Sequence, residues 1–212
     1  MSNIQRTNDF NEILSGRRSV RQYDATVKIS KEEMTEILTE ATLAPSSVNM
    51  QPWRFLVIDS EEGKATLAPL ARFNQTQVST SSAVIAVFGD LNNFDYGEEI
   101  YSKAVELGYM PQEVKEKQIA GLAAHFSKLD PQVNRETVLI DAGLVSMQLM
   151  LAARAHGYDT CPMGGYEKDQ IAESFGLDKE RYVPVMLISI GKAVDAGYQS
   201  VRLNIDKVAD WK

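Results

Sequence analysis

The chain has 212 residues, of which 44% are hydrophobic and 24% charged, and its formal net charge is −7. This length suffices for one well-buried core but is short for two independent domains, so we expect residues 1–212 to form a single domain. The acidic balance argues against nucleic acid or an anionic membrane as a general partner, because both attract basic surfaces.

Cysteine and histidine usage narrows the chemistry further. The single cysteine, Cys161, excludes an intrachain disulfide and a thiolate-rich metal cluster, and His125 and His156 do not have the spacing of zinc ligands. The N-terminus lacks a signal-peptide pattern, and no run approaches the roughly 18 uninterrupted apolar residues of a membrane-spanning helix. We therefore predict a cytoplasmic, metal-free protein with no membrane partner.

The N-terminal third predicts two helices. Apolar residues recur at helical spacing in residues 8–15, and Gly16 would end that helix in a left-handed conformation. Ser30 and Glu33 form a capping box for a second helix. That helix should end near Ala44, because Pro45 disfavours a helical residue before it.

Three apolar runs predict buried strands at residues 55–58, 83–88 and 185–191, the last beginning after Pro184. A short helix is expected over residues 64–71. Residues 92–135 are polar and poorly periodic, and they predict two helices joined near Gly108 and Pro111.

Residues 136–156 predict the longest helix, which Gly157 would end. It is apolar over so much of its circumference that it must be buried on several sides. The tail from 201 to 212 is too apolar for a free terminus. The pattern as a whole indicates one α+β domain, with helices around a small sheet.

The segment 17–21, Arg-Arg-Ser-Val-Arg, concentrates positive charge in an acidic chain. It could be a solvated turn whose charges favour the end of the preceding helix. If it is extended, however, Arg17, Ser19 and Arg21 share one side and Val20 faces the other. Guanidinium groups fit phosphate oxygens in bidentate fashion, so a small anion such as a phosphate group is the functional interpretation.

Two further loops present groups suited to a flat, polar ligand. The segment 45–53, Pro-Ser-Ser-Val-Asn-Met-Gln-Pro-Trp, offers hydroxyls and amides, although it could also be an ordinary rigid loop. The segment 162–165, Pro-Met-Gly-Gly, could be a plain turn, or its glycines could allow close backbone approach to a ligand. Cys161 beside it is expected to be a buried hydrophobe rather than a reactive thiol.

In their order and spacing these segments resemble the nitroreductase family of FMN-dependent oxidoreductases. The similarity lies in RRSVRQY, APSSVNMQPWRF, GLVSMQLMLAARAHGYDTCPMGG and VPVMLISIGKA. It spans nearly the whole chain and is weakest in residues 91–135. The resemblance implies a mixed sheet flanked by helices and a domain-entwined homodimer with FMN at the interface. It also implies a variable helical lid at 91–135 and a C-terminal arm at 198–212 that wraps the partner.

The resemblance implies specific cofactor-binding positions. The phosphate and flavin would be met from one subunit, with backbone groups of Gly164 and Gly165 near the flavin N5 atom. The other subunit would supply the polar loop. The positions are Arg17, Arg18, Ser19, Arg21, Asn74, Gln77, Pro162, Met163, Gly164, Gly165 and Arg202 from the first subunit and Pro45, Ser46, Ser47, Asn49 and Gln51 from the second.

The implied activity is a ping-pong transfer of hydride from NAD(P)H, through bound FMN, to a nitroaromatic, quinone or similar acceptor. No side chain need act as a catalytic acid or base, because the flavin supplies the chemistry. Candidate lid aromatics, which could equally be packing residues, are Tyr96, Tyr101, Tyr109 and Phe126.

Two departures from other members stand out. Gly164 occupies a place where some members have an acidic residue, and Ser200 stands where some have the lysine of a Lys-x-Arg pair. Substrate range and nicotinamide preference are therefore not inferred from those members. The alternatives are a flavin reductase, another enzyme of this fold, or a non-catalytic flavin-binding or redox-sensing protein.

Overall fold

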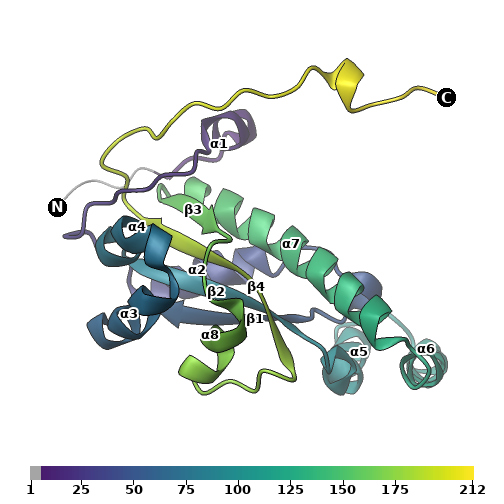
Figure 1. The fold of residues 1–212 in the computed structure, drawn as a ribbon. Coiled ribbons are helices and arrows are strands. Elements are labelled where there is room, and N and C mark those ends of the chain that lie inside the picture. The colour runs from purple at the N-terminus through teal and green to yellow at the C-terminus, as the bar shows by residue number, and fades with distance from the viewer. Residues whose placement is uncertain (1–5) are drawn as a thin grey trace.

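A computed structural model describes residues 6–212 and shows one four-stranded sheet with helices on both faces (Figure 1). The strands lie in the order β1-β2-β4-β3, and each neighbouring pair is antiparallel. The α+β class is confirmed. The parallel component expected of a mixed sheet is limited, within residues 6–212, to an isolated bridge between Ser19 and Thr160. The strands are β1 (Trp53–Ile58), β2 (Ala83–Asp90), β3 (Asp159–Met163) and β4 (Tyr182–Gly191).

The central strand β2 is buried on both faces, which explains its uninterrupted apolar sequence. Ile85 and Val87 point into one core, which α2 (Lys31–Ala41) and α7 (Pro131–Ala155) cover. Val84 and Phe88 point into a second core on the opposite face. That second core is covered by α3 (Glu61–Leu67), α4 (Gln75–Thr80) and α8 (Lys168–Ser174).

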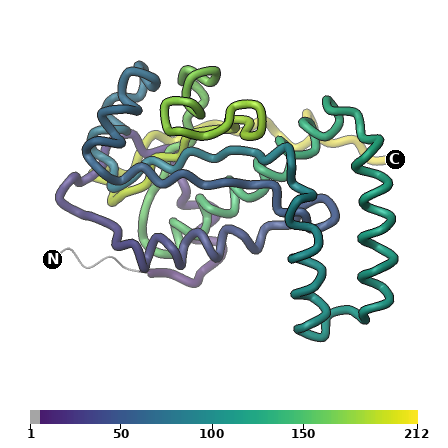
Figure 2. The backbone as a smooth tube through the Cα atoms, turned by 90° about the horizontal axis from the view of Figure 1, so that it is seen from below, coloured from purple at the N-terminus to yellow at the C-terminus, as the bar shows by residue number. Residues whose placement is uncertain are grey.

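Three helices lie outside these layers. The helices α5 (Gly97–Glu106) and α6 (Gln112–Phe126) lie side by side and project away from the sheet (Figure 2). They confirm the two helices predicted in residues 92–135, with Gly108 at φ 74° and Pro111 at the start of α6. The first helix, α1 (Phe10–Gly16), packs near the C-terminal end of α7.

The long helix α7 begins five residues before the predicted position 136. Asp130 caps it by accepting the N–H groups of Gln132 and Val133, and Pro131 occupies the first turn. Gly157, at φ 85°, follows its end as predicted. By length and hydropathy α7 could span a membrane, but half of its most apolar window is buried inside this fold, as in the core helix of a soluble protein.

The N-cap half of the box predicted at Ser30 is confirmed, because the Ser30 hydroxyl accepts the N–H of Glu33 at 3.1 Å. The Glu33 side chain does not return to the N–H of Ser30, and its carboxylate instead accepts the hydroxyl of Tyr158 at 2.7 Å. The prediction that Gly16 adopts a left-handed conformation is wrong. Gly16 is the last residue of α1, and the chain leaves through an extended Arg17 at φ −62° and ψ 129°. Arg18 makes this exit possible, since its guanidinium binds the carbonyl oxygens of Ser15 and Arg17.

The C-terminal arm, residues 198–212, runs away from the rest of the chain (Figure 1). It contains one short turn, Ile205–Lys207, and its apolar side chains are exposed. Trp211, for example, is 89% exposed. A single chain therefore gives these side chains nothing to pack against.

Candidate functional site

The arginine-rich segment runs beside β3, the strand that leads into the two glycines. The N–H of Val20 donates to the carbonyl oxygen of Thr160 at 3.0 Å, and the Val20 side chain is fully buried. Arg21, one residue on, is exposed. This is the alternation expected of an extended segment, and it leaves Arg17, Ser19 and Arg21 on the side opposite Val20.

Arg17 and Arg21 both lie near the thiol of Cys161. Burial raises the pKa of Cys161, and the charge of Arg21, contact with Gln77 and the charge of Arg17 lower it in part. Cys161 is 4% exposed and packs in the second core, which confirms that it is a buried hydrophobe. Arg18 is different, because its guanidinium is committed to the end of α1.

Asn74 and Gln77 join the same place from the start of α4. The Asn74 amide donates to the carbonyl oxygen of Gly165 at 2.9 Å, and the Gln77 amide donates to Asn74 at 3.2 Å. Gln77 is 7% exposed, so its position is held by the core. The structure thus brings together three segments that lie far apart in the sequence.

The backbone at Gly164 and Gly165 is open to solvent. No atom lies within 4 Å of where a Cβ would stand on Gly164, and on Gly165 only the Asn74 amide does, at 3.9 Å. Met163 points inward and is 3% exposed, so only its backbone can meet a ligand. We call this assembly the arginine–glycine site; its members are Arg17, Ser19, Arg21, Asn74, Gln77 and Pro162–Gly165.

The polar loop of residues 45–51 lies elsewhere and holds an unusual backbone. Val48, Asn49 and Gln51 have φ of 45°, 58° and 50°, a region that residues other than glycine seldom occupy and that is least accessible to a β-branched valine. Such strain persists only where surrounding contacts impose it, and it concentrates at functional sites.

Several hydrogen bonds impose this conformation. The hydroxyl of Ser46 accepts the N–H of Gln51 at 2.9 Å, and a carboxylate oxygen of Asp141 on α7 accepts the N–H of Ser47 at 3.0 Å. The hydroxyl of Tyr101 donates to the carbonyl oxygen of Val48 at 3.2 Å. Pro45 and Asn49 remain exposed and available to a ligand.

The loop and the arginine–glycine site lie at different positions along α7. Asp141 binds the loop, whereas Arg154 lies against Gly16, next to the arginine segment. Thirteen residues separate these two positions, which corresponds to about 20 Å along a helix at about 1.5 Å per residue. One chain therefore holds the loop and the arginine–glycine site at separate places.

Arg202 is the remaining predicted position. Its guanidinium binds the hydroxyl of Ser200 and the carbonyl oxygen of Val201, both in the arm. Nearer the body of the chain, the ring of Tyr198 lies 5.9 Å from the guanidinium of Arg21. The arm thus starts at the arginine–glycine site, and Arg202 lies outside it in this single chain.

Sequence reasoning missed two residues. Thr160, which is 2% exposed, supplies the carbonyl oxygen that holds Val20, and Asp141 anchors the loop from inside an apolar helix. The carboxylate in an otherwise apolar stretch was an available signal for Asp141, because buried charges are rare without a role. For Thr160 no sequence signal was available.

The lid aromatics have different environments. Tyr101 is buried and its hydroxyl holds the loop at Val48, whereas Tyr109 is 78% exposed at the turn between α5 and α6. Phe126 stacks on Phe94 with ring centres 4.9 Å apart. Tyr96 is partly exposed and its hydroxyl accepts a hydrogen bond from Arg54.

Comparison with known proteins gives concordant results. A family model described as the nitroreductase family matches residues 14–192. A Bacillus subtilis protein, provisionally named the NAD(P)H nitroreductase YdgI, is 78% identical over 98% of this chain and 99% of its own length. The CLA biosynthesis enone reductase of Lactiplantibacillus plantarum is 34% identical over 96% of this chain and 94% of its own length.

Solved structures show the same fold. A provisionally assigned nitroreductase from Exiguobacterium sibiricum, crystallised in complex with FMN, is 69% identical and superposes with a TM-score of 0.97. The alignment covers 99% of this chain and 100% of that chain.

Proposed function

The chain belongs to the nitroreductase family, and from this premise we propose that it is an FMN-dependent oxidoreductase that takes hydride from NAD(P)H. Its acceptors are nitroaromatics, quinones or similar compounds. We place it in the cytoplasm, as the composition suggests. The observation that supports this proposal best is the arginine–glycine site, where guanidinium groups, amides and open backbone converge.

The residues present fit FMN. Arg17, Ser19 and Arg21 supply donors for a phosphate group, and charged hydrogen bonds of this kind are the strong ones. The open space at Gly164 and Gly165 can take the edge of a flat ring, which a side chain would block. Arg18 and Arg202 are included in the proposed phosphate environment, although each guanidinium now binds carbonyl or hydroxyl oxygens of its own neighbours.

When bound, FMN supplies the two-electron redox chemistry, and the chain supplies binding and orientation. The backbone groups of Gly164 and Gly165 are proposed to face the N5 atom, where N–H groups stabilise negative charge. We propose a ping-pong order, in which NAD(P)H leaves before the acceptor enters the same open face.

The remaining contacts are proposed to come from a second copy of the chain. Asp141, which binds the loop, and Arg154, which lies beside Gly16 next to the arginine segment, are about 20 Å apart along α7. We therefore propose that the loop and the arginine–glycine site are half-sites that serve two different FMN molecules. Exposed apolar side chains on α7 offer a surface for the partner, and the arm would wrap it. These are Ile140, Leu144 and Met147, with exposed fractions of 66%, 44% and 38%.

Reduction and reoxidation of the purified protein test the proposal. We expect a yellow protein whose flavin absorbance is lost on anaerobic addition of NADH or NADPH and returns on addition of a nitroaromatic, a quinone or an enone. Denaturation should release FMN in a ratio of one per chain. Colourless protein that does not take up added FMN would refute the proposal.

The same experiment separates the alternatives. A flavin reductase would turn over fastest with free flavin as the acceptor. A non-catalytic flavin-binding or redox-sensing protein would be yellow and inert to both nicotinamides.

A further inference from the structure

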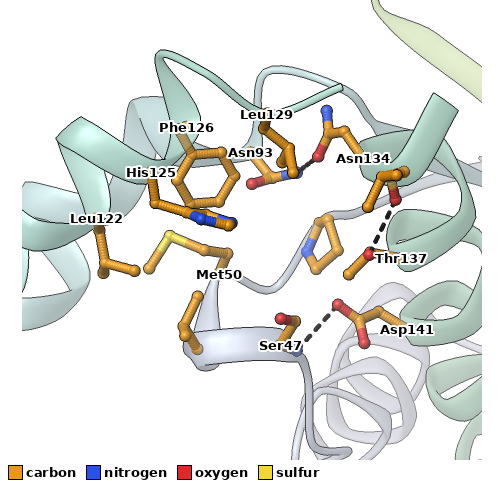
Figure 3. Close-up of a pocket in the computed structure, with 13 residues that line it drawn as sticks. Ser47, Met50, Asn93, Leu122, His125, Phe126, Leu129, Asn134, Thr137 and Asp141 are labelled. Atoms are coloured by element: carbon orange, nitrogen blue, oxygen red, sulfur yellow. Dashed lines mark hydrogen bonds between the residues drawn. The ribbon is translucent and has the colours of Figure 1, made fainter. Parts of the chain in front are cut away.

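A cleft of about 140 Å³ lies between α6, the N-terminal half of α7 and the inner side of the loop of residues 45–51 (Figure 3). Leu122, His125 and Phe126 of α6 form one side of it, and Thr137 and Asp141 of α7 form the other. An apolar cavity of about 150 Å³ in another protein holds a benzene molecule, so this cleft matches one aromatic ring in size.

Asn93 lines this cleft and has an unpartnered side-chain oxygen. The residue is 4% exposed, and its amide nitrogen donates to Asn134 and to the carbonyl oxygen of Asp90. Both partners are acceptors, so the side chain cannot be turned over without facing oxygen against oxygen. Its own oxygen, Oδ1, is buried and has no hydrogen-bond partner within residues 6–212. Figure 3 shows this oxygen turned away from Asn134 and toward α6.

Asp141 provides a second acceptor. One carboxylate oxygen accepts the N–H of Ser47, and the other has no hydrogen bond among the residues that the structure describes. The nearby polar groups of α7 are already committed. The hydroxyl of Thr137 donates to Val133, and Asn134 donates to Leu91 while it accepts from Asn93.

The cleft therefore has apolar walls and two acceptors that lack donors. Buried acceptors without donors are costly, and a ligand that supplies a donor removes the cost. We propose that the cleft binds a single aromatic ring carrying an O–H or N–H group, which donates to Asp141 and Asn93. A ring that carries only acceptors leaves both oxygens unpaired.

If the proposed function holds, the preference for a donor makes the cleft bind reduced products of turnover. Hydroxyarenes and arylamines are the reduced forms of quinones and nitroarenes, so the cleft favours the product class over the oxidised acceptor. A ligand there also contacts Val48 and Met50 of the loop that is proposed to reach the flavin. Product bound in the cleft then acts on the flavin site through that loop.

Calorimetric titration of the FMN-loaded protein, without NAD(P)H, tests the binding. The probes are phenol and toluene, which share one size and differ in the donor. We expect saturable binding of phenol, at least about tenfold tighter than that of toluene, because hydrogen bonds to charged groups are the stronger class. Absence of saturable phenol binding, or equal binding of both probes, overturns the proposal.

Variants locate the site. Leu122→Phe fills the cleft and should abolish phenol binding, whereas Ala123→Phe, one residue on, exposed and not part of the lining, should keep it. Asp141→Asn should weaken phenol binding by about tenfold and leave toluene unchanged. Phenol binding that persists in Leu122→Phe places the ligand elsewhere and overturns the proposal. Protein that retains no FMN contradicts the proposed function and not the cleft proposal. Phenol binding to the cleft can still be measured on such protein.

Discussion

Neighbouring arginines in one short segment have different partners. Arg18 stabilises the end of α1, whereas Arg17 and Arg21 lie on the side of Cys161, which belongs to the strand that leads into the glycines. The extended conformation next to β3 decides this, because alternate residues face opposite sides. Composition alone could not separate structural from ligand-binding guanidinium groups.

Replacing Arg21 should weaken FMN binding. Arg21→Ala removes one charged donor from the proposed phosphate site, which corresponds to a loss of about 1.5–3 kcal/mol. The dissociation constant of FMN, measured by fluorescence of the released flavin, reports it. Arg135→Ala is the control, because Arg135 is exposed and lies near the start of α7, far along the helix from Arg154, which lies beside the arginine segment. Equal dissociation constants for the wild type and Arg21→Ala would remove Arg21 from the site.

Asp141 should make stability depend on pH. Burial raises the pKa of Asp141 from its usual value of 3.8, and the N–H of Ser47 opposes part of the rise. A raised pKa contributes stability that is complete below the usual value and is lost as the pH rises through the folded-state value. Asp141→Asn cannot ionise, so its Tm should approach or exceed that of the wild type as the pH rises through this window.

Thermal unfolding of both proteins from about pH 3 to about pH 7 measures this difference. His125, the other titratable group that lines the cleft, is present in both proteins and cancels. Asp159, whose pKa is also raised by burial, cancels in the same way. A Tm difference that is constant with pH would show that the ionisation of Asp141 does not matter.

At the scale of elements, sequence reasoning succeeded where the signal was local. The N-cap at Ser30 and the apolar run of β2 depend on neighbouring residues, and both were predicted correctly. The strand β3 was missed because it contains Pro162 and few apolar residues. It forms because β4 supplies its pairing, and as an edge strand it tolerates a proline.

The start of α7 was missed for another reason. Asp130 and Pro131 form a recognisable N-terminal signal, but the predicted start at residue 136 rested on the apolar periodicity, which begins later. The half-sites show the same division. The pairing of the arginine segment with β3, which leads into the glycines, fits the predicted grouping. The anchoring of the loop by Asp141 depends on a long-range contact that no local pattern encodes.

The exposed side of α7 should mediate dimer formation. Ile140→Glu places a charge where an apolar side chain is 66% exposed in the single chain. Because each dimer would contain two copies, the dissociation constant should rise by roughly two orders of magnitude. Analytical ultracentrifugation over a concentration series measures it. Ile140→Leu, which keeps the apolar surface, should remain dimeric. A dimer that tolerates Ile140→Glu would place the interface on another surface.

At the scale of the whole molecule, the arm should become buried when two chains associate. Trp53 and Trp211 are the only tryptophans, so Trp53→Phe leaves Trp211 as the sole reporter. Its emission should be blue-shifted at high protein concentration and move to the red on dilution or in combination with Ile140→Glu. Red emission at every concentration would mean that the arm does not pack against a partner.

The sequence was sufficient for the fold class and for the order of the main elements, because one apolar strand and one apolar helix dominate the core. It was insufficient for the assembly. The arm and the outer side of α7 have exposed apolar side chains whose partner lies outside a single chain, and no intrachain contact explains them. The apolar composition of the arm and of α7 indicated burial. Only the separation of the half-sites along α7 indicates that a second copy of the chain would cover these surfaces.

The single helix α7 binds the polar loop through Asp141, near its middle, and lies beside the arginine segment through Arg154, near its C-terminal end. In a symmetric pair, each α7 helix would therefore be connected to both prosthetic groups, to one through the loop and to the other through the arginine segment. A small tilt of α7 caused by binding of FMN at the first site would be transmitted through the helix to the second site. Binding of FMN at the two sites would then be coupled, and the first and second molecules would bind with different affinities even though the two chains are identical.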